Sequence, residues 1–126
     1  ERAPAATRLT DLPGEPLKGL AATFLVYPYA AYPALTTARG WTGARPRVSA
    51  VVCGKDQVVG HRHPARAFDR LERDGLEVER LTLADATHAF EDQGASDPRS
   101  RFRRDLFDQT KAWYALQLGK AFASRG

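Results

Sequence analysis

The chain has 126 residues, of which 43% are hydrophobic and 27% charged, a composition typical of one globular domain with enough apolar material for a core. Its 19 Lys and Arg residues against 15 acids give a net charge of +4, and because this excess is spread along the chain, no nucleic-acid partner is expected. One cysteine excludes a disulfide framework and a cysteine-rich zinc module, and no apolar run approaches the ~20 residues of a membrane-spanning helix, so no membrane partner is expected.

The first residues predict an extended leader. Residues 1–19 contain three prolines and two glycines with little apolar periodicity, which is typical of extended or turn structure. The chain has no methionine and opens at Glu1, so we expect a processed, trimmed or fragmentary polypeptide whose domain covers residues 20–126. A lone cysteine is compatible with both the cytoplasm and the periplasm of a bacterium, and we expect a soluble protein.

Two apolar segments predict strands, and a helix follows them. Residues 20–27 are an unbroken apolar run that stops at Pro28, which predicts a strand buried on both faces of a helix-covered parallel sheet. Residues 48–53 predict a second buried strand, which ends at Gly54. Residues 64–74 predict an amphipathic surface helix, with Pro64 at its first position and a glycine as its cap.

The remainder of the chain completes an alternation of strands and helices. Residues 77–83 predict a third, more polar strand nearer the sheet edge. Residues 101–122 predict a last helix with an apolar face of Phe107, Tyr114, Leu118 and Phe122. This order is typical of an open α/β fold. An unpaired strand as apolar as residues 20–27 would be an aggregation-prone edge, so we expect further strands on its N-terminal side.

Ionisable side chains follow the second and third predicted strands. Asp56 lies after the second strand and His88 after the third, and adjacent parallel strands bring such loops to the same end of a sheet. An aspartate that accepts the imidazole N–H fixes the tautomer of a catalytic histidine and stabilises its protonated form. Asp85 is the alternative acid, although it shares the histidine's own loop and would have to fold back.

The residues around these two groups resemble a known family. Residues 51–59 (VVCGKDQVV) resemble the acid-bearing turn of dienelactone hydrolase-like members of the α/β-hydrolase superfamily, and residues 86–90 (ATHAF) resemble their histidine loop. The resemblance covers roughly residues 20–122 but only the C-terminal half of such an enzyme. It implies the C-terminal part of a doubly wound, mostly parallel α/β-hydrolase sheet with flanking helices.

The resemblance also implies an activity. Such a hydrolase cleaves an ester, lactone or related acyl bond of a small molecule with a nucleophile–Asp–His triad, in which Asp56 is the acid and His88 the general base. No Gly-x-Ser-x-Gly or Gly-x-Cys-x-Gly turn is present, and none of the four serines fits the triad order. A companion chain or N-terminal segment would therefore carry the nucleophile and the oxyanion hole. The alternative is a noncatalytic α/β binding or interaction module.

Other residues have two interpretations each. Cys53 stands where the resembled families usually have glycine; it is a candidate nucleophile or, alternatively, a small buried hydrophobe at a strand end. Tyr27 and Tyr29 are candidate substrate-binding residues, and core packing is the alternative. Glu91 and Asp92, after the histidine, are expected to be solubilising loop charges.

The sequence gives little reason to expect a metal or cofactor. His61 and His63 form a His-x-His pair, but two ligands alone are a weak metal signal. No glycine-rich phosphate-binding fingerprint is present, so a nucleotide cofactor is not expected. The one dense basic run is flanked by acids and predicts a solvated start of the last helix: Arg99, Arg101, Arg103 and Arg104.

Overall fold

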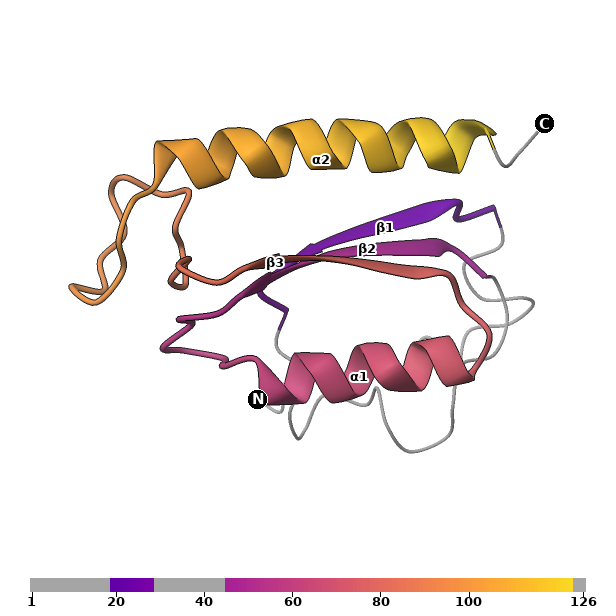
Figure 1. The fold of residues 1–126 in the computed structure, drawn as a ribbon, viewed down its shortest axis with the longest axis horizontal. Helices are drawn as coiled ribbons and strands as arrows, with labels where there is room; N and C mark the ends of the chain where they lie inside the picture. Colours follow the sequence, from indigo (N-terminus) through magenta and orange to yellow (C-terminus); the bar gives the residue numbers. More distant parts are fainter. Residues whose placement is uncertain (1–18, 29–44, 124–126) are drawn as a thin grey trace, which may run out of the picture.

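Two strands come first among the described elements, and a helix, a strand and a helix follow them, in the order that the sequence predicts. The computed structural model describes residues 19–28 and 45–123. Its elements, in chain order, are β1 (Ala22–Val26), β2 (Arg47–Cys53), α1 (Arg62–Arg73), β3 (Val78–Leu83) and α2 (Arg104–Ala123). The three strands form one parallel sheet in the order β1-β2-β3. Helix α1 covers one face and α2 the other, which makes a small α/β fold (Figure 1).

Strand β2 is the centre of the sheet and the best buried element. Its residues Val48, Ala50, Val51 and Cys53 are all buried, because hydrogen-bonded strands flank β2 on both sides and helices lie over both faces. The prediction of a buried strand here is confirmed, with one further residue at its start. In the ladder between β2 and β3, Cys53 is opposite Leu83, so both strands end at the same edge.

Helix α1 begins two residues before the predicted start and buries one side against the sheet. Pro64, Ala67 and Phe68 are its buried residues. Gly75 follows the helix with φ +89°, a left-handed conformation that favours glycine, and its N–H donates to the Glu72 carbonyl at 3.0 Å. The predicted glycine cap is therefore confirmed. The guanidinium carbon of Arg80, in β3, lies 5.3 Å from the centre of the Phe68 ring, so this side chain packs between α1 and the sheet.

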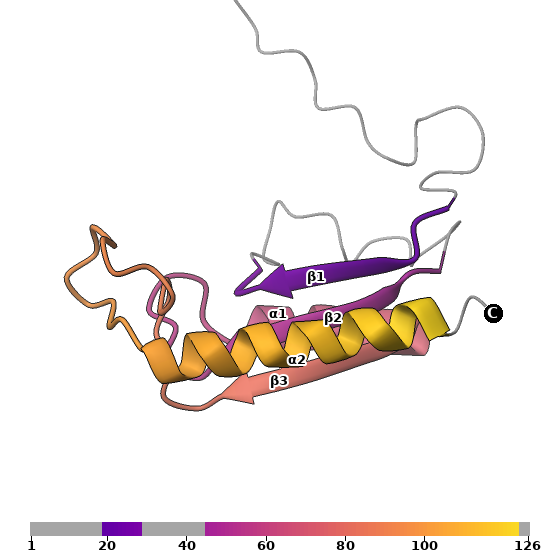
Figure 2. The ribbon, with the colours of Figure 1, turned by 90° about the horizontal axis from the view of Figure 1, so that it is seen from above.

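The prediction that the first strand is buried on both faces is wrong for the part of the chain that the structure describes. β1 covers residues 22–26 and lies at the edge of the sheet (Figure 2). Leu20 and Phe24 are 38% and 36% exposed. The physical reason is position: within the described ranges β1 has a partner strand only on its β2 side, so its apolar side chains are only partly covered.

The predicted apolar face of the last helix is wrong in its second half. Leu118 and Phe122 are 45% and 67% exposed, whereas Thr110, Gln117 and Ala121 are the buried residues of α2. Gln117 is a buried polar side chain with partners from the sheet. Its Nε2 donates to Glu79 Oε2 at 2.7 Å, and its Oε1 accepts from Ser49 Oγ at 3.3 Å. These bonds satisfy the amide, so a polar residue occupies the face that periodicity assigned to leucine.

A hydrophobic cluster lies beneath the carboxyl edge of the sheet. It consists of Val51, Cys53, Leu83, Ala86 and Phe90, and the last of these is completely buried. Ala86 and Phe90 belong to the loop that follows β3, so this loop packs on the ends of β2 and β3 through the cluster. Within residues 19–28 and 45–123, no helix is long and apolar enough to cross a membrane.

Candidate active site

The loops after β2 and β3 are joined by backbone contacts at the carboxyl edge. The Gly54 N–H donates to the Leu83 carbonyl and the Lys55 N–H to the Ala86 carbonyl, both at 2.9 Å. A Cβ atom at residue 54 would lie only 2.5 Å from the carbonyl oxygen of Ala84. Glycine is therefore required at this position by the close approach of the two chains.

Asp56 follows this glycine and is almost fully buried, with 1% of its side chain exposed. Its Oδ1 accepts the N–H groups of Val58 and Val59, each at 2.9 Å. Its Oδ2 lies 3.1 Å from Nδ1 of His88. Three donors therefore surround a buried carboxyl group, which compensates for the loss of water around it and fixes its orientation.

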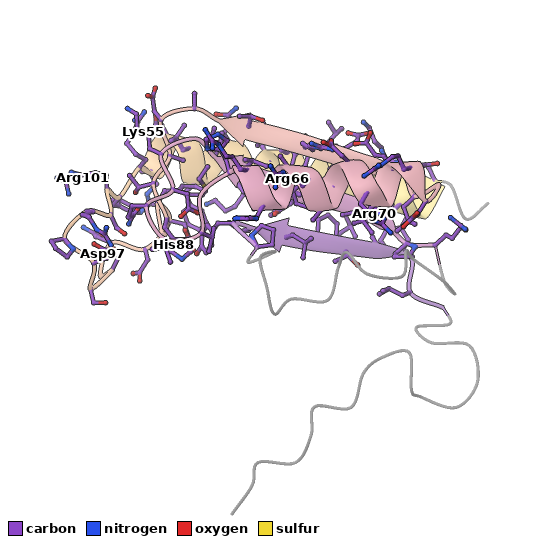
Figure 3. The ribbon with its side chains drawn as sticks, turned by 90° about the horizontal axis from the view of Figure 1, so that it is seen from below. Lys55, Arg66, Arg70, His88, Asp97 and Arg101 are labelled. Carbon is purple, nitrogen blue, oxygen red and sulfur yellow. The ribbon has the colours of Figure 1, made fainter. Side chains whose placement is uncertain are left out.

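His88 is the partner of Asp56 and keeps part of its ring open, with 23% of its side chain exposed. When Nδ1 carries the proton and donates a hydrogen bond to Asp56, the lone pair of the ring is on Nε2, the nitrogen that can take a proton from another group. The side chain lies at the same end of the molecule as Lys55 and the loop that carries Asp97 (Figure 3). The structure thus brings together the two residues to which the sequence assigned the acid and the base.

Tyr27 packs against the imidazole from the end of β1. The centres of the Tyr27 and His88 rings are 4.1 Å apart, and the phenol donates a hydrogen bond to Glu91 Oε1. Burial and the Glu91 carboxylate raise the pKa of the Tyr27 phenol well above its usual range, so the phenol remains a donor. Tyr29 lies outside the described residues.

Glu91 is not the solubilising charge that the sequence suggested. One of its oxygens accepts from Tyr27, and the other is buried without a hydrogen-bond partner among the residues that the structure describes. The reason is a tertiary contact, because β1 places the phenol of Tyr27 beside the loop that carries Glu91. Asp92 is exposed, and its Oδ1 accepts the Gly94 N–H at 2.8 Å.

Comparison with known proteins adds no relative. No protein-family model, no curated protein and no solved structure matches this chain.

The two alternative catalytic groups have different environments. Cys53 is 2% exposed and belongs to the hydrophobic cluster, and burial and the nearby Asp56 carboxylate raise the pKa of its thiol to about 12. It has the character of a small buried hydrophobe rather than of an activated nucleophile. Asp85 is exposed and pairs with Lys55 at 2.9 Å, and this hydrogen-bonded pairing lowers the pKa of its carboxyl group. It therefore does not supply the acid for His88.

The remaining charged candidates lie at the surface. His61 and His63 are exposed, and the described ranges contain no group of three or more His, Cys, Asp or Glu side chains that could hold a metal ion. Arg99 pairs with Asp97 at 2.9 Å and Arg103 with Asp105 at 2.7 Å. The basic run is thus partly neutralised by its acidic neighbours, as the sequence indicated.

Two residues beside His88 were missed by the sequence analysis. Gln57 Oε1 accepts the His88 N–H at 3.1 Å, and Ser100 Oγ donates to the His88 carbonyl at 2.7 Å. The only signal for Gln57 was its place directly after the candidate acid. No sequence signal indicates Ser100, which lies 12 residues after His88.

Proposed function

We propose that this chain is the C-terminal part of an α/β hydrolase similar to the dienelactone hydrolases, which cleaves an ester, lactone or related acyl bond of a small molecule. The observation that carries the proposal is the 3.1 Å contact between Asp56 Oδ2 and His88 Nδ1. It joins a buried carboxyl group to a partly exposed imidazole at the carboxyl edge of a parallel sheet, where open α/β folds gather their functional groups.

In this mechanism His88 transfers a proton, and Asp56 holds the imidazole of His88 in place. Nε2 of His88 takes the proton of the nucleophile as that group attacks the acyl carbon, and then delivers it to the leaving oxygen. Water subsequently hydrolyses the acyl intermediate with the same histidine as base. Asp56 keeps the lone pair on Nε2 and stabilises the imidazolium, while the ring of Tyr27 limits the space on one side of the imidazole.

The nucleophile is proposed to come from an upstream segment or a companion chain. Ser49 is buried in β2 beside Gln117, and the hydroxyl of Ser100 is bonded to the backbone of His88. Neither can attack a substrate. An oxyanion hole would come from the same companion segment.

The outer side of β1 supports the proposal that further sheet is present in the complete enzyme. An apolar groove of about 290 Å³ lies between the exposed part of β1 and α2, lined by Phe24 of the strand and by Tyr114, Ala115 and Leu118 of the helix. A soluble domain rarely leaves the apolar edge of a parallel sheet uncovered. Additional strands alongside β1 would cover this groove and give the doubly wound sheet that the motifs imply.

The test uses the protein from its source together with any polypeptide that copurifies. A fluorophosphonate probe should label a serine in the companion segment (or iodoacetamide a cysteine), and ester hydrolysis should depend on that group. His88→Ala should lower turnover about 10⁶-fold, whereas His61→Ala, which changes an exposed histidine, should leave it unchanged. Near-normal turnover of His88→Ala would remove His88 from the mechanism, and absence of any labelled companion and of hydrolysis would favour a noncatalytic α/β binding module.

A further inference from the structure

Three hydrogen bonds form a closed ring through the backbone of His88. Its N–H donates to Gln57 Oε1 at 3.1 Å. Its carbonyl accepts from Ser100 Oγ at 2.7 Å. The ring closes because Gln57 Nε2 donates to Ser100 Oγ at 3.0 Å. Both backbone groups of the candidate base are thus held by side chains from two other segments.

The orientation of the Gln57 amide is fixed by its surroundings. Its oxygen faces a donor, the N–H of His88, and its nitrogen faces two acceptors, Ser100 Oγ and Asp97 Oδ2 at 3.3 Å. A flipped amide would place a donor against a donor and an acceptor against two acceptors. Asp97 is itself held by two bonds from the Arg99 side chain, at 3.1 and 2.9 Å.

The loop needs such external support at this point. Ala89, the residue after His88, has φ +58°, a left-handed conformation that is unfavourable for alanine. A loop strained next to its functional residue keeps that geometry only when neighbouring contacts fix it. The ring supplies these contacts on both sides of the His88 Cα atom.

The turn that follows β2 therefore makes two contacts with His88. Asp56 contacts the imidazole, and the next residue, Gln57, contacts the backbone of the same histidine. The backbone N–H and the imidazole of His88 are thus both held by residues of one short turn. The position of Nε2 therefore depends on the backbone contact as well as on the hydrogen bond between the imidazole and Asp56.

We propose that Gln57 and Ser100 are positioning residues, which hold the His88 backbone so that Nδ1 faces Asp56 and Nε2 faces the nucleophile. The catalytic consequence rests on the proposed hydrolase function, but the effect on the imidazole does not. Neither residue contacts the reacting atoms; both act through His88.

The first measurement is made on the 126-residue chain alone. Nitrogen-15 NMR reports which ring nitrogen of neutral His88 carries the proton, and the unmodified chain should show the Nδ1–H form. Gln57→Leu and Ser100→Ala should each give a mixture with the Nε2–H form, while Ser100→Thr, which keeps a hydroxyl, should restore the single form. Gln93→Leu and Ser96→Ala change exposed residues of the neighbouring loop and are the matched controls.

The second measurement is made on the complete enzyme. Both disruptive variants should lower kcat about 10- to 100-fold with little change in KM, because a misplaced base affects the chemical step more than binding. If the two residues had a purely structural role, their variants would unfold at a lower urea concentration. The His88 tautomer would then be unchanged at urea concentrations well below that midpoint. If Gln57→Leu does not fold, Gln57→Met, whose side chain has a similar length but no amide, is used in its place.

The outcomes separate the two proposals. An unchanged tautomer in folded variants of both residues overturns the positioning role, whatever the enzyme does. A mixed tautomer in a protein without hydrolase activity supports the positioning role and refutes the proposed function.

Discussion

Replacing Gly54 with alanine tests whether the close contact between the two site loops holds Asp56 beside His88. The added Cβ would lie 2.5 Å from the carbonyl oxygen of Ala84 and 2.9 Å from its Cα atom. Ordinary contact begins near ~3.5 Å, so the loops must separate by roughly 1 Å. The obstacle is backbone and cannot rotate away, and overpacking of this kind costs about 1–3 kcal/mol.

The separation would also lengthen the bond between the Gly54 N–H and the Leu83 carbonyl, now 2.9 Å. We therefore expect Gly54→Ala to lower the free energy of unfolding by about 2–3 kcal/mol and to weaken the Asp56–His88 contact. Urea unfolding followed by far-UV circular dichroism measures the first effect, and the His88 tautomer reports the second.

Gly119 offers the matched control, because it lies in α2 and a Cβ there would meet nothing within 4 Å. Gly119→Ala should raise the free energy of unfolding by about 1 kcal/mol, the difference in helix propensity. Opposite signs for the same chemical change would tie the loss at Gly54 to its contact. If Gly54→Ala is as stable as the unmodified chain and keeps the Nδ1–H tautomer, the reasoning about the close approach is refuted.

Four further predictions concern the Asp56–His88 pair and the hydrophobic cluster beneath it. Asp56→Asn keeps an acceptor for the two backbone N–H groups but can present an amide N–H to Nδ1, so the imidazole should switch to the Nε2–H tautomer and turnover of the proposed hydrolase should fall about 10⁴-fold; an unchanged NMR tautomer would contradict this. Phe90 is 0% exposed, so Phe90→Ala should cost about 3–5 kcal/mol in urea unfolding, and a loss below about 1 kcal/mol would exclude it from the core. Cys53 should resist a disulfide reagent in the folded chain and react once urea unfolds it, because its thiol is buried and protonated. The fold raises the pKa of this thiol from 9.0 to about 12, so the unfolded chain loses the proton first, and the free energy of unfolding should fall as the pH rises above about 9. Cys53→Ala should flatten that decline in urea titrations at several pH values.

The order of elements could be predicted from the sequence because it depends on local patterns. The run ending at Cys53 is apolar and bounded by Pro46 and Gly54, and these features do not depend on distant partners. The buried face of α2 could not be predicted in the same way. Gln117 is buried because Glu79 and Ser49 satisfy its amide, and these contacts exist only after the sheet has formed.

The contacts of the candidate site also fall into a part that the sequence predicts and a part that it does not. Asp56 and His88 follow neighbouring strands, so parallel pairing alone places them at one edge, and the structure puts them in contact. The partners that come from elsewhere were not predictable: the bond from Tyr27 to Glu91 joins residues 64 positions apart, and that between Gln57 and Ser100 spans 43. Periodicity and motif spacing carry no information about contacts of this kind.

The pairing of β2 with β3 fixes where Asp56 and His88 lie relative to each other. Their contact therefore does not depend on the length of the segment that connects the two strands. Cys53 is opposite Leu83, and each functional side chain lies a few residues beyond one of these two positions. The crossover between the strands, with α1 at its centre, runs over one face of the sheet and returns (Figure 1). Insertions in the crossover loops are therefore compatible with an intact Asp56–His88 contact, whereas one added residue between Cys53 and Asp56 would displace the carboxyl group.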